Sequence, residues 1–150
     1  MTQISLSTAR LGRCWLLALP LVAGAALASE GQDLTFQGDA SFQGPHGGQA
    51  IQAAVVDTDT GDTIAVKTGE VAADADPAFS FEFTGALMEG GSYAVHYWID
   101  SNFGGGSPGQ CDDMQHDHQW SVPIEAGAGP VTHTENHDPS AQSAVCETFR

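Results

Sequence analysis

The residues from Ser92 to Asp100 have the sequence SYAVHYWID, a run rich in aromatic and β-branched side chains. Side chains alternate between the two faces of a β-strand, so the apolar residues from Tyr93 to Ile99 at odd positions share one face, and Trp98 lies on the other. Both faces are substantially apolar, which is typical of a strand that is covered on both sides. The sequence therefore predicts a central strand of a β-sheet here.

The chain after residue 28 has few helix signals, and glycine interrupts it at short intervals. Six more short apolar runs have the composition of strands: Leu34–Gln37, Gln49–Asp57, Thr63–Thr68, Phe79–Phe83, Gln119–Ile124 and Val131–Thr134. About seven short strands separated by turns predict an all-β fold, a single antiparallel β-sandwich. The residues expected in its core are Phe81, Val95, Tyr97, Ile99, Trp120 and Val122.

Residues 1–28 have the features of a secretory signal peptide. Arg10 and Arg13 supply positive charge, and the apolar run that follows is shorter than the roughly 20 residues a membrane span requires. The sequence Ala-Leu-Ala that ends at Ala28 is a small-residue cleavage site. Cleavage there leaves residues 29–150, enough for one domain with a single core. We expect this domain in the periplasm or outside the cell, without membrane insertion.

The expected mature chain is strongly acidic. All 19 Asp and Glu residues follow Ala28, where Lys67 and Arg150 are the only Lys or Arg residues, so the formal charge of this part is −17. Such a surface repels nucleic acid and anionic lipid headgroups, and nucleic-acid binding is therefore not expected. Solubility alone is a sufficient reason for the charge, which attracts cations without selecting among them.

Two cysteines, Cys111 and Cys146, remain after cleavage of the signal peptide. An even number of cysteines in an exported chain predicts a disulfide. The bond would close a loop of about 36 residues, which stabilises the fold by roughly 3–4 kcal/mol in the chain-entropy model. It would also tether the C-terminal tail to the loop that precedes the Gln119–Ile124 strand.

Three short motifs occur along the chain: PHGGQ at Pro45–Gln49, a strand that begins with GSY and ends in DSNFG at Gly91–Gly104, and DHQW at Asp117–Trp120. In this order they resemble small exported proteins that have immunoglobulin-like or prealbumin-like β-sandwiches. The resemblance covers most of the expected mature chain. It implies one of these two forms of the sandwich and does not imply an activity.

Histidines and oxygen donors gather near the ends of the predicted strands. His116 and His118 are two residues apart, so on a strand their side chains point the same way, together with that of Trp120. Several strand ends can meet at one rim of a sandwich. The sequence therefore predicts a site for a divalent metal ion at the rim, formed by His46, Asp100, His116, His118 and His133, with Met114, Asp112 and His137 as further candidates.

Imidazole combined with carboxylate suits zinc or copper, and the thioether of Met114 would add affinity for Cu(I). Binding should weaken as the pH falls through about 6.5, because protonated imidazole cannot coordinate a metal. Calcium is less favoured. Asp100, Asn102 and Gly104 resemble the first half of a calcium loop, but Cys111 stands where that loop needs a bidentate Glu. Loop histidines that bind no metal are the alternative.

No catalytic motif is present. The sequence lacks a Gly-x-Ser-x-Gly elbow and a phosphate-binding Gly-x-x-x-x-Gly-Lys loop. We therefore predict an exported, non-enzymatic domain that binds a metal ion. The alternative is an adhesion or carbohydrate-binding module, in which exposed Trp98 and Trp120 would stack on sugars, or a purely structural domain.

Overall fold

The computed structural model describes residues 31–150, so the predicted signal peptide lies outside the described residues. None of the helices in residues 31–150 is long and apolar enough to cross a membrane. The elements in chain order are β1 (Gln32–Gly38), the 3-10 turn η1 (Ala40–Phe42), α1 (Gln43–His46), β2 (Ala50–Asp57), β3 (Thr63–Glu70), β4 (Phe79–Leu87), β5 (Ser92–Ile99), β6 (His118–Glu125), β7 (Val131–Glu135), η2 (Pro139–Ala141) and η3 (Cys146–Phe149).

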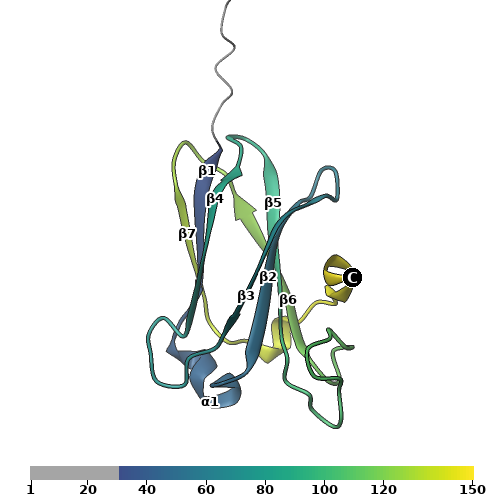
Figure 1. Cartoon of the computed structure of the whole chain (residues 1–150). Helices are drawn as coiled ribbons and strands as arrows, with labels where there is room; N and C mark the ends of the chain where they lie inside the picture. The colour runs from purple at the N-terminus through teal and green to yellow at the C-terminus, as the bar shows by residue number, and fades with distance from the viewer. Residues whose placement is uncertain (1–30) are drawn as a thin grey trace, which may run out of the picture.

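The strands form two sheets that face each other (Figure 1). One sheet has the order β4-β1-β7 and the other has the order β3-β2-β5-β6. The predicted all-β sandwich of seven strands is confirmed. One pairing departs from the antiparallel pattern, because β1 and β7 run parallel. The chain crosses from β6 in one sheet to β7 in the other, so no tight hairpin imposes an antiparallel direction on this pair.

The core lies between the two sheets. In β4, Phe79, Phe81 and Phe83 are buried while the intervening Ser80 and Glu82 are exposed, as strand alternation requires. The six residues predicted for the core all belong to it: Phe81, Val95, Tyr97, Ile99, Trp120 and Val122.

The central strand β5 is covered on both faces, as its sequence indicates. On the inner face, Tyr97 stacks on Trp120 with a centroid distance of 4.9 Å. On the outer face, Trp98 contacts Phe149 of η3 with a centroid distance of 6.3 Å. Trp98 and Trp120 are only 2% and 3% exposed. These indole rings therefore do not form a sugar-stacking platform at the surface.

The predicted disulfide between Cys111 and Cys146 is present. It joins the long connection between β5 and β6, residues 100–117, to η3 at the end of the chain. A second constraint on this connection is the buried carboxylate of Asp117, which accepts backbone N–H groups of Ser101 at 3.0 Å, Asn102 at 3.2 Å and Asp112 at 2.9 Å. The disulfide and the carboxylate of Asp117 together hold this connection, which has no regular secondary structure.

The double substitution Cys111→Ser/Cys146→Ser should lower the free energy of unfolding by roughly 3 kcal/mol, because the unfolded chain gains the entropy of the opened loop. Urea unfolding followed by tryptophan fluorescence measures the difference. The parent protein treated with a reductant is the control and should unfold like the double variant. Identical midpoints for the oxidised parent and the variant would contradict a stabilising role of the disulfide.

Candidate metal centre

His46 reaches the site from the connection between β1 and β2. Asp39 caps the first turn of this connection by accepting the backbone N–H of Ser41 at 2.9 Å. The next residue, Phe42, is fully buried and packs edge-on against Phe79 with a centroid distance of 5.0 Å. Helix α1 follows and ends at His46. The imidazole of His46 is therefore fixed against the core, with no exposed surface.

His118 is the first residue of β6 and pairs with Ile99 of β5. Strand alternation places its side chain on the same side as Trp120, and the two ring centroids are 5.6 Å apart. The alternation does not extend back to His116, because the chain forms a turn before β6 begins. In this turn the backbone N–H of His116 donates to the carbonyl of Asp113 at 2.9 Å.

His137 lies two residues beyond β7, in the segment that leads from the three-stranded sheet toward η2. Its backbone N–H donates to the Oγ of Ser41 at 2.8 Å. Its ring packs edge-on against Phe42 with a centroid distance of 5.5 Å. The connection between β1 and β2 thus positions this irregular segment as well as His46.

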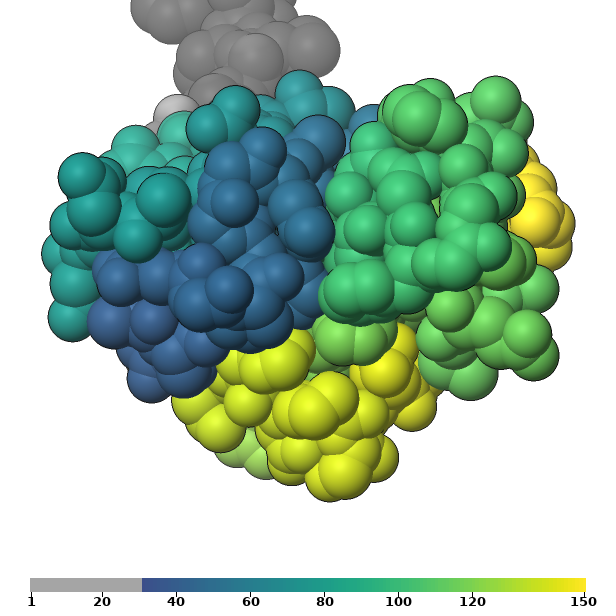
Figure 2. Space-filling model, turned by 90° about the horizontal axis from the view of Figure 1, so that it is seen from below, coloured from purple at the N-terminus to yellow at the C-terminus, as the bar shows by residue number. Residues whose placement is uncertain are grey.

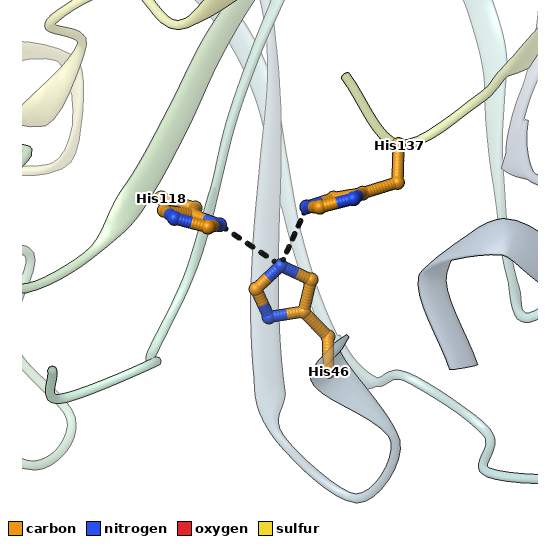
Figure 3. Close-up of side chains that lie close together, drawn as sticks. All are labelled: His46, His118 and His137. Atoms are coloured by element: carbon orange, nitrogen blue, oxygen red, sulfur yellow. Dashed lines mark hydrogen bonds between the residues drawn. The ribbon is translucent and has the colours of Figure 1, made fainter. Parts of the chain in front are cut away.

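The three histidines converge at the end of the sandwich where α1 lies, and Figure 2 shows the α1 region, the long β5–β6 loop and the C-terminal tail meeting there. The Nε2 atom of His46 is 3.0 Å from Nδ1 of His118 and 3.1 Å from Nε2 of His137 (Figure 3). One ring nitrogen from each histidine lies within 4.8 Å of the others. The structure thus joins the predicted ligands His46 and His118 to His137, which the sequence offered as a further candidate.

The hydrogen bonds of His46 determine which of its nitrogens is free. Its Nδ1 lies 2.7 Å from Oε1 of Gln49. The amide oxygen only accepts hydrogen bonds, so Nδ1 carries the proton in the neutral ring. The lone pair is then on Nε2, which points toward His118 and His137 (Figure 3). A hydrogen bond of this kind to the second ring nitrogen commonly orients a metal-binding histidine.

All three imidazoles are neutral at neutral pH. Burial lowers the pKa of His46 to about 4, and the positive charges that His118 and His137 would carry lower it too, against the opposing hydrogen bond to Gln49. Burial is also the main cause that lowers the pKa values of His118 and His137. The pH at which protons compete with a metal ion is therefore lower than the 6.5 that the sequence alone suggested.

Aromatic rings surround the cluster. Trp120 contacts all three imidazoles, with centroid distances of 6.4 Å to His46, 5.6 Å to His118 and 5.9 Å to His137. Phe103, on the β5–β6 loop, lies 5.0 Å from His118. His46 is buried, whereas His118 and His137 are partly exposed, so the aromatic rings shield part of the cluster from water.

The structure does not bring the predicted ligands Asp100, His116 and His133 to this cluster. Asp100 accepts hydrogen bonds from the Asn102 side chain and from the backbone N–H of Gly109. The Nδ1 of His116 bonds to the carbonyl of Phe103 at 2.6 Å, and this bond raises the pKa of His116.

His133 lies in β7, stacked on Phe36 with a centroid distance of 5.8 Å. Its Nε2 is 2.5 Å from the carboxylate of Glu135. Of the three further candidates, Asp112 and Met114 also lie outside the cluster. Asp112 accepts the backbone N–H of Ser107, and Met114 is 43% exposed beside a surface pocket that Cys146 also lines. In the β5–β6 loop, the carboxylates of Asp100, Asp112 and Asp117 thus accept backbone N–H groups of the loop itself.

Gln49 is the contributor that the sequence analysis missed. It lies three residues after His46 in the PHGGQ motif, and that spacing within a single turn was the signal for a contact between the two side chains. Trp120 was expected in the core and lies there, and its ring also contacts His46 of the histidine cluster.

No protein-family model and no curated protein matches the chain. Among solved structures, a fimbrial assembly protein from Parabacteroides distasonis is similar over 70% of this chain, with 12% sequence identity and a TM-score of 0.38. The similarity covers 51% of that protein, so the chain spans about half its length. Nothing about function is transferred from a likeness of this size.

The burial of His46 predicts a specific dependence of stability on pH. The pKa of folded His46 is about 4, below the unfolded value of 6.5, so between these values the unfolded state binds more protons. Stability is then complete above about pH 6.5 and decreases as the pH falls toward 4, by an amount on the order of 3 kcal/mol for this group. Urea unfolding with EDTA present at pH 7 and pH 4.5 measures the decrease.

The variant His46→Gln should lose much of this pH dependence, because the titrating group is gone. The variant His116→Gln is the control and should retain it, since His116 lies outside the cluster. Parallel stability curves for the parent and His46→Gln between pH 4.5 and 7 would show that the cluster does not control acid sensitivity.

Proposed function

We propose that this protein is an exported, non-enzymatic domain that binds a transition-metal ion, zinc or copper, through His46, His118 and His137. The observation that supports the proposal most directly is the convergence of three neutral imidazole nitrogens within 4.8 Å. In a tetrahedral site with metal–nitrogen bonds of about 2.0–2.1 Å, neighbouring nitrogens are about 3.3 Å apart. The distances of 3.0 Å and 3.1 Å from His46 Nε2 differ from this value by only a few tenths of an ångström.

The polar contacts within the cluster also favour a bound ion. Two ring nitrogens, from His118 and His137, approach the single lone pair of His46 Nε2. One lone pair has one preferred direction, so it cannot accept two good hydrogen bonds at once. A metal ion between the three nitrogens satisfies all of them together, whereas buried polar groups without a good partner destabilise a fold.

The choice of donors favours zinc or copper over calcium. Imidazole nitrogen suits zinc and copper, while calcium requires six to eight oxygen ligands. The overall negative charge raises the local concentration of all cations, and this effect is screened beyond about 8 Å at physiological salt. Selectivity therefore depends on the three nitrogens and not on the acidic surface.

The exported location and the absence of catalysis are parts of the same proposal. A disulfide such as Cys111–Cys146 persists mainly in oxidising compartments, which supports a periplasmic or extracellular protein. Two candidate acid or base groups, Asp100 and His116, lie outside the cluster and are engaged in hydrogen bonds of the β5–β6 loop. A binding function therefore fits the described residues better than a hydrolytic one.

The double variant His118→Ala/His137→Ala should bind zinc and Cu(II) more than about 100-fold more weakly than the parent, because removal of even an outer partner of a ligand costs 10–100-fold. Calorimetric titration at neutral pH and physiological salt measures the affinities. Excess zinc should also stabilise the parent, by about 2.7 kcal/mol at 100 times the dissociation constant, and should not stabilise the variant.

The matched control is His116→Ala/His133→Ala, which also removes two imidazoles but leaves the cluster intact. It should bind like the parent. If this control loses binding and the His118/His137 variant retains it, the ligands have been assigned to the wrong histidines. If the parent binds neither ion, the protein belongs to the adhesion or structural class.

The hydrogen bond from His46 to Gln49 leads to a separate test of the site. Gln49→Leu should weaken zinc binding by about 10–100-fold, because the ring of His46 loses the partner that fixes its protonated nitrogen. Gln49→Glu, which keeps an acceptor oxygen in place, is the matched variant and should retain or strengthen binding. Equal affinities for Gln49→Leu and the parent would show that Gln49 does not orient His46.

A further inference from the structure

The donor set and its surroundings carry information on the charge of the bound ion. All three candidate ligands are uncharged imidazoles, and no carboxylate or thiolate joins them in the described part of the chain. Neutral donors cancel none of the charge of the ion among its direct ligands. The cost of placing a charge in a medium of low polarity grows with the square of that charge, so a divalent ion incurs about four times the cost of a monovalent one.

The medium around the cluster is apolar on several sides. Each imidazole lies within contact range of at least two aromatic rings, supplied by Phe42, Phe103 and Trp120. His46 has no exposed surface at all. His118 and His137 are partly exposed, so the shell is open on one side. On the sides that it covers, such a shell limits water and lowers the local polarity, which influences the redox potential of a metal.

The charges of two carboxylates, Asp117 and Asp138, act on His118 and His137, but hydrogen bonds hold both carboxylates outside the cluster. Asp117 accepts three backbone N–H groups of the β5–β6 loop. Asp138 accepts the backbone N–H of Ser140 at 2.8 Å and its hydroxyl at 2.6 Å. Neither carboxylate belongs to the cluster, so the candidate ligands themselves are uncharged nitrogens only.

From these observations we infer that the site prefers copper as Cu(I) over copper as Cu(II), an inference that rests on the metal-binding function proposed above. Three uncharged donors in an aromatic shell suit a monovalent ion that needs few ligands. Cu(II) favours tetragonal coordination with nitrogen and oxygen donors, which this group of residues does not supply. The consequence is a reduction potential above that of copper in water.

The test compares the two oxidation states in the full mature chain. Cu(I) affinity is measured without oxygen, with ascorbate as the reductant and bathocuproine disulfonate as the competing chelator. Cu(II) affinity is measured with nitrilotriacetate as the competitor. The ratio of the two dissociation constants fixes the change in potential, at about 59 mV for each factor of ten in a one-electron couple. The parent should bind Cu(I) at least tenfold more tightly than Cu(II).

Phe103 offers a sharp variant because its side chain is 42% exposed and contacts His118. Phe103→Asp places a negative charge beside the site, which should favour the divalent state. The ratio of Cu(I) to Cu(II) affinity should fall on the order of threefold to tenfold. Zinc binding should become tighter, since zinc is divalent. Phe103→Asn is the matched uncharged variant and should shift the ratio less.

Met88→Asp is the control for total charge. Met88 is 46% exposed and precedes the Ser92 end of β5, whereas His118 pairs with the Ile99 end. This variant should leave the ratio unchanged. If the parent binds Cu(II) more tightly than Cu(I), the preference for Cu(I) is wrong, although the metal-binding function stands. The same holds if Phe103→Asp and Met88→Asp change the affinity ratio equally. A parent that binds neither copper nor zinc would overturn the proposed function as well.

Discussion

Both the core and the histidine cluster depend on the packing of Trp120. One side of its ring stacks on Tyr97 at the centre of β5, and its edge meets Phe42 with a centroid distance of 6.1 Å. Its Nε1 donates to the backbone carbonyl of Asp138 at 2.9 Å, which holds the segment that carries His137. The same ring therefore connects β5, the η1 turn and the segment after β7, and it contacts all three candidate ligands.

Much of the fold follows from local sequence patterns. Alternation in β4 and β5 identifies the buried faces, since apolar residues two apart in a strand must point to the same side. The same rule correctly placed His118 beside Trp120. It failed for His116 because the strand begins only at His118, and the position of a strand end depends on the turn before it.

Such local patterns could not predict that His46, His118 and His137 lie together. His46 is buried because the η1–α1 turn inserts Phe42 into the core, and this turn has no strong helix signal in the sequence. His137 lies on an irregular segment whose path depends on the crossing between the sheets. Asp100 has a carboxylate that could bind a metal ion, but this carboxylate accepts the N–H of Gly109 within the β5–β6 loop. Each of these outcomes is decided by tertiary contacts.

The candidate ligands are far apart along the chain, and this has a kinetic consequence. His46 is separated from His118 by 72 residues and from His137 by 91. Closing loops of this length in an unfolded chain is entropically costly, so the unfolded protein rarely brings these three ligands together. An ion captured only after the sandwich has formed contributes nothing to the folding transition state. It would slow unfolding and lengthen the lifetime of the native protein, while the rate at which the chain first folds stays the same.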